Sequence, residues 1–389
     1  MRPLSIGVAT IGRHHVLDLA RELAALGHQV AFWSVVPRRQ TARYGLPAAA
    51  RRSLLPRLLP LVVARRYGGS RLSAVAGREL LAAADRVIAR RLEPCDVFIG
   101  MSGLCVESAR AARARYGATV FLERGSRHVL SQKAILDDLR RGGLRADTVP
   151  DYVVERELAG YALADRIAVP AKHVEQSFLD EGVAADKLFR NPYGVDLSMF
   201  PPTPAPGTHL PTLLFAGAWS YQKGVDRLEA AWRTLDGVRL LHVGPVGDAP
   251  LPAAPGFVHV DPVPQWRLPE YYAQAHVFVM ASRQEGLSLV QAQALACGVP
   301  VVCTDRTGGA DLQTMLSDPG WVSVVASEDV EALAASIRSM LARALNLHGQ
   351  RNLLGETRSH LGWAAYAERY AEELVRVVGR GRGSMVRTP

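Results

Sequence analysis

Residues 282–302 read SRQEGLSLVQAQALACGVPVV, and this stretch decides the fold. An apolar run at residues 277–280 precedes it, and residues 289–296 are small or apolar at helical spacing. Gly298 ends the helical pattern, and a second apolar run covers residues 300–304. This order predicts two parallel strands joined by a helical crossover, as in an open α/β sheet. The turn at Glu285 and Gly286 then lies at the carboxyl edge, where such sheets bind ligands.

The helix that follows this turn, and the turn itself, carry groups that can bind a phosphate and a sugar. Its first backbone N–H groups have no acceptor inside the helix and can bind phosphate. Glu285 can accept hydrogen bonds from sugar hydroxyls, and Gln293 lies two helical turns further along the same face. The alternative, on spacing alone, is an ordinary crossover with an exposed glutamate.

The same alternation of strand and helix extends in both directions from this stretch. Before it, apolar runs predict strands at residues 4–10, 29–35, 97–100, 118–122 and 166–170. Helical patterns lie between most of these runs, and a proline-rich segment at residues 201–211 interrupts the series. The alternation then resumes at residue 212. The prediction is an α/β protein of two Rossmann-like domains, with the ligand cleft between them.

Residues 282–302 resemble the signature of the retaining glycosyltransferases of family 4, which have the GT-B fold. That signature is Ser-x-x-Glu-Gly, a glutamate eight residues after the first, a run of small residues, and Gly-x-Pro-Val. Four other segments are similar to family motifs in the same order along the chain. They are Ala164-Asp165 with Val169-Pro170, residues 191–196 with Phe200, the loop at residues 215–224 that ends in Lys223-Gly224, and Trp363 with Tyr366.

The resemblance implies an arrangement of the whole chain. We expect an N-terminal acceptor domain at residues 1–193, a linker at 194–211, a C-terminal donor domain at 212–362, and a helix with a basic tail at 363–389 that crosses back to the first domain. The donor would be a nucleotide-diphosphate sugar, with no metal and no further cofactor. The sugar would pass to a hydroxyl with retention of configuration, and the protein would position both substrates and neutralise the departing diphosphate.

Site residues follow from the motif positions. Lys223 would bind the diphosphate, Glu285 would hold sugar hydroxyls at the reaction centre, and Gln293 would lie at the ribose. The other predicted donor-binding residues are Gly12, Arg13, Gly217, Ser220, Gly224, Gly286, Ser288, Leu289 and Val290.

Two strand exits in the first domain carry polar residues. After residue 122 come Glu123, Arg124, Ser126 and His128, and we assign Glu123 and His128 to the reaction centre. Arg124 and Ser126 are predicted to bind the acceptor, as are His14 and His15 after the first strand. The alternatives are polar loop residues at His14 and His15, and a buried Glu–Arg pair that fixes the loop after residue 122.

Two positions depart from the family pattern. Ala218 stands where the family has an arginine in the phosphate loop, and Gln293 replaces the second glutamate. Glutamine still hydrogen-bonds a ribose hydroxyl, but the missing arginine removes a strong bidentate contact. Arg13, Arg124 and Arg283 are candidates to replace it. These departures keep a second hypothesis open, a non-catalytic protein that binds nucleotide sugars.

The net charge of +9 is concentrated in one segment. Residues 38–91 hold 13 arginines, no lysine and two acidic residues, a charge of +11, which leaves −2 for the rest of the chain. Leucines and valines at residues 54–63 lie among these arginines, so an anionic membrane surface is the favoured partner. Solvated helix faces are the alternative, and the few aromatic residues argue against nucleic acid. We expect a cytoplasmic protein, peripheral on the inner face of the plasma membrane, that builds cell-surface polysaccharide or glycolipid.

Overall fold

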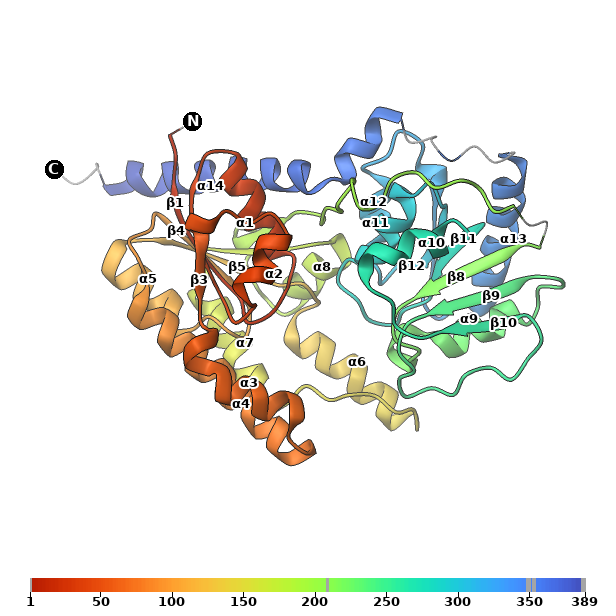
Figure 1. The fold of residues 1–389 in the computed structure, drawn as a ribbon, viewed down its shortest axis with the longest axis horizontal. Coiled ribbons are helices and arrows are strands. Elements are labelled where there is room, and N and C mark those ends of the chain that lie inside the picture. The colour runs from red at the N-terminus through yellow and green to blue at the C-terminus, as the bar shows by residue number, and fades with distance from the viewer. Residues whose placement is uncertain (1, 208–209, 348–350, 352–354, 386–389) are drawn as a thin grey trace.

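The computed structural model describes residues 2–207, 210–347, 351 and 355–385. Two parallel sheets lie side by side, each covered by helices (Figure 1). This architecture confirms the predicted GT-B arrangement of two Rossmann-like halves. The boundaries of domains and linker stay predictions.

The first sheet has the strand order β3-β2-β1-β4-β5-β6-β7. Its strands are β1 Ser5–Ala9, β2 Gln29–Ser34, β3 Arg51–Ser53, β4 Val97–Met101, β5 Thr119–Glu123, β6 Arg166–Val169 and β7 Leu188–Arg190. The helices of this half are α1 Val16–Ala25, α2 Arg38–Arg43, α3 Leu55–Tyr67, α4 Ser70–Arg91, α5 Glu107–Tyr116, α6 Val129–Arg141, α7 Asp151–Leu163 and α8 Lys172–Asp180.

The second sheet has the strand order β10-β9-β8-β11-β12-β13. Its strands are β8 Thr212–Ala216, β9 Arg239–Val243, β10 Phe257–Val260, β11 Val277–Met280, β12 Val301–Thr304 and β13 Val322–Val325. Its helices are α9 Val225–Trp232, α10 Leu268–Tyr272, α11 Leu289–Ala296, α12 Gly309–Gln313 and α13 Val330–Asn346, and the chain continues into α14 Trp363–Met385.

Central strands are buried on both faces, as parallel sheets require. Every residue of β8, β11 and β12 is buried. Short edge strands were harder to predict: β3 and β7 have three residues each and contain arginines, so they lack the apolar run of a central strand. Both add to the end of a row of strands that the apolar runs had already located.

The two halves are joined by two chain segments that lie together. The Val195 N–H donates to the Leu361 carbonyl over 2.7 Å, and the Asn191 side chain donates to the Tyr366 carbonyl. A Cβ on Gly194 would lie 2.6 Å from the backbone of Trp363, so only glycine fits this crossing. Helix α14 then runs back along the first half and packs against α1 (Figure 1), as the predicted crossing helix should.

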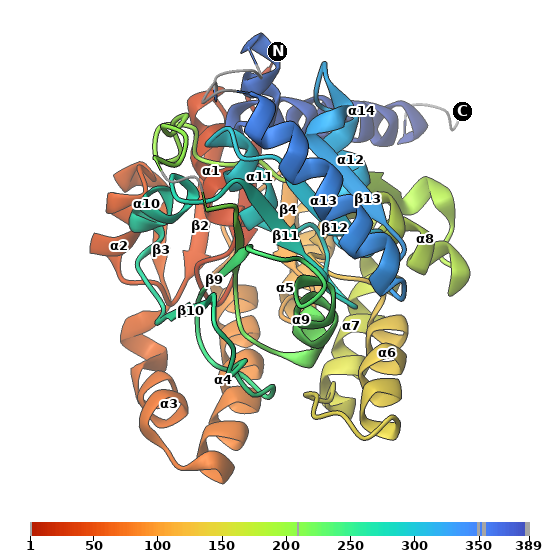
Figure 2. The same cartoon turned by 90° about the vertical axis from the view of Figure 1, so that its right-hand side faces the viewer.

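The arginine-rich segment forms a helical hairpin. Helices α3 and α4 pack against each other, turn at Gly68 and Gly69, and extend away from the sheets (Figure 2). The sequence predicted a helical pattern only at residues 75–92, because Pro56 and Pro60 interrupt the earlier run; Pro56 lies in the first turn of α3, where proline is tolerated. No helix in the part of the chain that the structure describes combines the length and apolar character needed to cross a bilayer.

Candidate active site

Lys223 and Glu285, predicted from separate motifs, meet at the carboxyl edge of the second sheet. Lys223 ends a short 3₁₀ turn after β8, and its ammonium donates to a carboxylate oxygen of Glu285, which follows β11. Gly224 has φ +68°, and a Cβ there would lie 1.9 Å from the Ala281 carbonyl oxygen. Glycine is therefore required for the two loops to approach this closely.

The ammonium of Lys223 is largely removed from water. Burial lowers its pKa to about 8, because a charged group loses hydration there. The Glu285 carboxylate forms an ion pair with this ammonium, so the charges of the two predicted donor-binding groups offset each other. A nucleotide diphosphate at Lys223 has to compete with the Glu285 carboxylate.

The loop that carries Glu285 also touches the first half of the molecule. A Cβ on Gly286 would lie 1.9 Å from the Gly125 carbonyl oxygen, and the Glu285 carbonyl lies 3.2 Å from Nε2 of His173, which must donate. The Gln284 amide donates to the Ser126 hydroxyl over 2.5 Å. Ser126, predicted to bind the acceptor, thus lies at the junction with the donor loop.

The start of α11 was predicted to offer backbone N–H groups to phosphate. The Ser288 N–H donates to the Thr307 carbonyl over 3.2 Å, so this group is already used. Leu289 and Val290 open the helix, where N–H groups have no acceptor within the helix itself. Gln293 is buried and accepts a hydrogen bond from the Tyr272 hydroxyl over 3.2 Å. It also lines a cavity of about 210 Å³ between the two halves.

His15 and Glu123 form a pair on the opposite wall of this cavity. Nε2 of His15 donates to a Glu123 oxygen over 2.7 Å, and the imidazole packs on the Tyr193 ring, with ring centroids 4.2 Å apart. The Tyr366 hydroxyl donates to the other Glu123 oxygen over 3.4 Å. Glu123 is 1% exposed and does not line the cavity, whereas His15 does. The geometry makes Glu123 the group that orients His15.

Arg13 and His14 also line this wall, and Gly12 directly precedes them without lining the cavity. Arg13 is exposed, donates to the Gln265 side chain of the second half over 2.8 Å, and covers the Tyr44 ring. His14 lines the cavity beside Arg13, while the Gly12 carbonyl accepts a hydrogen bond from Thr10. Among the three arginines considered as replacements for the family's phosphate-loop arginine, Arg13 is the exposed one.

Arg124 and His128 occupy positions inside the first half instead of the cleft. Arg124 donates to Glu157 over 2.8 Å and to Gln132 over 2.7 Å, and it is buried. The His128 ring packs between Tyr161 and Phe178, and its Nδ1 accepts the Leu130 N–H at the start of α6. Burial, and next the charge of Arg124, lowers the pKa of His128 to about 4. Both side chains fix the loop after β5.

Arg283 is likewise committed to its own domain. Its guanidinium donates to both oxygens of Asp226 over 2.6 Å and to the Tyr221 carbonyl over 2.7 Å. It therefore supports the loop of Lys223, and it also lines a separate cavity of about 400 Å³ with Arg227 and Arg306. Gly217 and Ser220 lie earlier in the same loop, where the Gly217 carbonyl accepts a hydrogen bond from His242.

Two further cross-domain contacts involve Asp311 and His173, which the sequence analysis did not single out. The Asp311 carboxylate in the second half accepts the Lys172 N–H at the start of α8, over 3.0 Å, and pairs with Arg190. His173 reaches the Glu285 carbonyl, as described above. A lysine and a histidine at a helix start carry no sequence signal for a partner more than 100 residues away.

A comparison with known protein families identifies the second half. The model described as "Glycosyl transferases group 1" matches residues 210–343, which include both Lys223 and Glu285. These residues are a group 1 glycosyl transferase domain. This match, with the fold described above, confirms the resemblance to the retaining family 4 enzymes.

Individual relatives are similar to part of the chain. A D-inositol 3-phosphate glycosyltransferase from Xylanimonas cellulosilytica is 32% identical over 189 residues, which is 41% of this chain and 44% of that protein. The chain thus matches less than half the length of this relative.

Solved structures show the same fold over nearly the whole chain. Sucrose-phosphate synthase from Thermosynechococcus elongatus has a TM-score of 0.65 at 18% identity, covering 97% of this chain and all of that one. HepE from Anabaena, in complex with UDP-glucose, has a TM-score of 0.59 at 12% identity, covering 98% of this chain and all of that one.

Proposed function

We propose that the protein is a retaining glycosyltransferase that moves a sugar from a nucleotide-diphosphate donor to a hydroxyl of a glycan or lipid-linked acceptor. The observation that carries this proposal is the pairing of Lys223 with Glu285 in the group 1 domain. Gln293 of the same domain and His15 of the first half both line the cavity between the two halves. The biological setting we propose is the synthesis of cell-surface polysaccharide or glycolipid.

On this proposal each side of the cleft has one task. Lys223, together with the N–H groups of Leu289 and Val290, binds the diphosphate and stabilises its charge as it departs. When the donor diphosphate binds Lys223, the Glu285 carboxylate is free to accept hydrogen bonds from hydroxyls of the transferred sugar. His15, held by Glu123, hydrogen-bonds the acceptor hydroxyl near the sugar. Rate acceleration then comes from positioning and from preorganised charge.

A labelled panel of nucleotide sugars tests transfer against simple binding. The transferase proposal expects label to move from at least one donor to water or to a glycolipid extract. If the protein binds nucleotide but moves no label with any donor, the non-catalytic binding protein suggested by Ala218 and Gln293 is the better description.

The α3–α4 hairpin supports a membrane surface as a partner. Its exposed apolar side chains lie towards its tip: Leu59, Val63, Tyr67, Leu72 and Val75. The same two helices carry exposed arginines: Arg57, Arg65, Arg66, Arg71 and Arg78. Apolar groups that insert shallowly and basic groups that attract anionic headgroups, together on one hairpin, suit peripheral binding on the inner face of the plasma membrane.

Some residues that the sequence pattern assigned to membrane binding are buried or already used in other contacts. Leu54 and Leu58, counted among the membrane-facing residues from sequence, are buried against the first sheet. Arg51 and Arg52 are used in contacts with the Leu46 carbonyl and with Glu93. Leu72→Ser with Arg65→Gln should abolish co-sedimentation with anionic vesicles at low salt. Neutralising Arg140 and Arg141 on α6 is the matched control and should leave it intact.

A further inference from the structure

The loop of Lys223 has an unused backbone donor at Ala218, the position where the family pattern has an arginine. The flanking N–H groups, of Gly217 and Trp219, donate to carbonyls of β9 and of the segment after it, over 3.0 and 2.9 Å. The Ala218 N–H between them has no acceptor among the residues that the structure describes. Ala218 is half-buried and follows the carboxyl end of β8.

The hydrogen bonds of Trp219 show where this N–H points. The N–H and the C=O of Trp219 both bond to the segment after β9, as in a parallel bridge. In such a pairing the groups of the adjacent residue point to the opposite side, which here is the side of β11. The planar trans peptide gives the same direction, because the Gly217 carbonyl is bonded to His242 of β9 and the Ala218 N–H points the opposite way. The loop that carries Glu285 follows β11, so the Ala218 N–H is directed towards the predicted donor site.

His242 fixes the orientation of the peptide between Gly217 and Ala218. Its Nε2 lies 2.9 Å from the Gly217 carbonyl oxygen and must donate, since a carbonyl has no hydrogen. The ring is fully buried against Phe215 and Trp219, and this burial lowers its pKa to about 4, so the ring is neutral. A neutral imidazole has one N–H, so Nδ1 of His242 is an acceptor.

His259 in turn fixes which nitrogen of His242 carries the hydrogen. The two histidines are in register on the neighbouring strands β9 and β10, and their rings stack with centroids 4.8 Å apart. Nδ1 of His259 lies 2.9 Å from Nδ1 of His242, which is the acceptor, so His259 donates. Without this donor, the His242 hydrogen could move to Nδ1, and a lone pair would then face the Gly217 carbonyl. The pair therefore holds the peptide in one orientation.

A backbone N–H can take over part of the task of the missing arginine. N–H groups held on a rigid loop bind phosphate oxygens, and no side chain has to be ordered when they do so. We propose that His242, held by His259, is a positioning residue that keeps the Ala218 N–H directed at the donor diphosphate. This inference rests on the proposed function, because its ligand is the same nucleotide diphosphate that Lys223 binds.

Calorimetry of the full-length protein with UDP and with GDP compares two substitutions of His242. His242→Phe keeps a buried ring but loses the hydrogen bond, so affinity for the nucleotide that binds should fall about tenfold, the effect of one hydrogen bond to a charged group. His242→Gln loses the ring, but its amide donates to the Gly217 carbonyl, so affinity should stay within about threefold of wild type. Ring packing alone would give the opposite order.

Two further variants test the other links and do not depend on the buried ring of His242. His259 is half-buried, and His259→Phe removes only the donor to His242, so affinity should fall about threefold. His259→Asn keeps an N–H donor and should restore it. Ala218→Arg, added to His242→Phe, supplies a guanidinium to the same diphosphate and should recover the affinity of the wild type.

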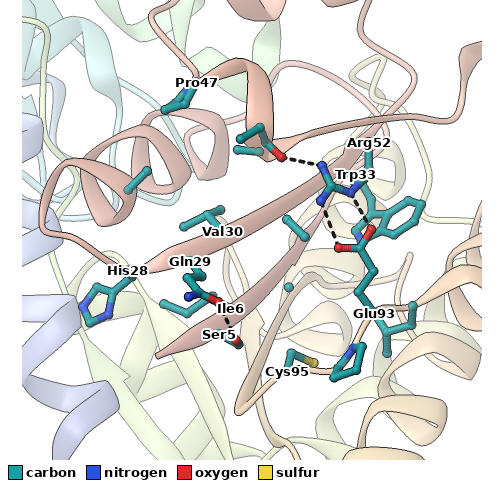
Figure 3. A pocket seen from close by; sticks show the side chains of 17 residues that line it. Ser5, Ile6, His28, Gln29, Val30, Trp33, Pro47, Arg52, Glu93 and Cys95 are labelled. Atoms are coloured by element: carbon teal, nitrogen blue, oxygen red, sulfur yellow. Dashed lines mark hydrogen bonds and ion pairs between the residues drawn. The ribbon is translucent and has the colours of Figure 1, made fainter. Parts of the chain in front are cut away.

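His28 is the matched control for a buried, neutral histidine. Its Nδ1 accepts the Leu4 N–H over 3.2 Å, and burial lowers its pKa. It lines a cavity of about 400 Å³ at the amino ends of β1 and β2, far from the carboxyl edges that form the cleft. The ion pair in this cavity, Arg52 with Glu93, is satisfied internally (Figure 3). His28→Phe should therefore leave nucleotide affinity unchanged.

The outcomes separate this inference from the proposed function. A tenfold loss in His242→Phe that His242→Gln avoids supports it, whether or not the protein transfers sugar. Wild-type affinity in His242→Phe or His259→Phe, equal losses in both His242 variants, or the same loss in His28→Phe would overturn it. A wild-type protein that binds neither UDP nor GDP would overturn it as well. Transfer is measured separately, with the labelled donors.

Discussion

The predicted donor residues of the second half, here the donor wall, and the predicted acceptor residues after β5, here the acceptor wall, are arranged differently. On the donor wall, Lys223 and Glu285 come from separate loops and meet directly. On the acceptor wall, four polar residues within six positions separate: Ser126 reaches the donor loop, Glu123 lies behind His15, and Arg124 and His128 enter the interior. Loops anchored by glycines at parallel strand ends carry their side chains to one edge. The side chains of a polar run that follows a strand can point in any direction.

The largest expected effect tests the donor wall. Lys223→Ala removes the charge that meets the diphosphate, so transfer should fall by at least about 100-fold, comparable to the loss of one transition-state donor. Initial rates with a labelled donor measure this loss. Lys133→Ala, which removes an ion pair with Asp137 on α6, is the control and should retain wild-type rates. Rates near wild type in Lys223→Ala would show that transfer does not need the charge of Lys223.

Glu285→Gln should change transfer and diphosphate binding in opposite directions. Transfer should fall by about tenfold or more, because the carboxylate that holds sugar hydroxyls is lost. A nucleoside diphosphate should bind about 3-fold tighter, since Lys223 no longer has a competing carboxylate. Calorimetry with the nucleoside diphosphate measures the second effect. Weaker binding of the diphosphate would show that the Lys223–Glu285 contact does not compete with the donor.

The pH dependence of donor binding tests whether the charge of Lys223 binds the diphosphate. The ammonium form of Lys223 binds the diphosphate, and its pKa in the free protein is about 8. Affinity should therefore be full below that pKa and fall as pH rises through it, by about tenfold from pH 7 to pH 9. Titrations across this window measure the change. Lys223→Arg stays charged throughout, so a profile identical to wild type would assign the dependence to another group.

Glu123→Gln tests whether the acceptor wall works through His15. The amide keeps a contact with His15 but loses the charge, so we expect the KM for acceptor to rise by about fivefold while donor binding is unchanged. Kinetics with varied acceptor, compared with His15→Ala, measure this. If Glu123→Gln reduces transfer further in a His15→Ala background, Glu123 acts independently of His15.

The smallest expected effect on transfer belongs to His128. His128→Ala should leave the rate within about twofold of wild type, because the ring faces Tyr161 and Phe178. The free energy of unfolding should fall by about 2 kcal/mol, from lost packing and a lost helix cap. Denaturant unfolding and initial rates together measure both. A rate loss without a change in stability would return His128 to the reaction centre.

Most central elements could be predicted from sequence because parallel strands must be apolar along their whole length. The edge strand β10 could be predicted as well, whereas β3, β7 and helix α3 could not, because their arginines or prolines hide the pattern. At the site, Lys223 and Glu285 were found through motifs. His173 and Asp311 were missed because each acts across the junction of the two halves, on a partner that no local pattern specifies.

By itself, the sequence determined the two parallel sheets, and its resemblance to the family implied the crossing helix and the roles of Lys223 and Glu285. Apolar periodicity and glycine placement are local properties, so they can be recognised along the chain. Only the tertiary structure decided which of the residues Glu123 to His128 face the cleft, which leucines of the basic hairpin stay exposed, and that His242 and His259 meet beside the loop of Lys223. These depend on packing between distant segments, and the chain order does not encode it in any short pattern.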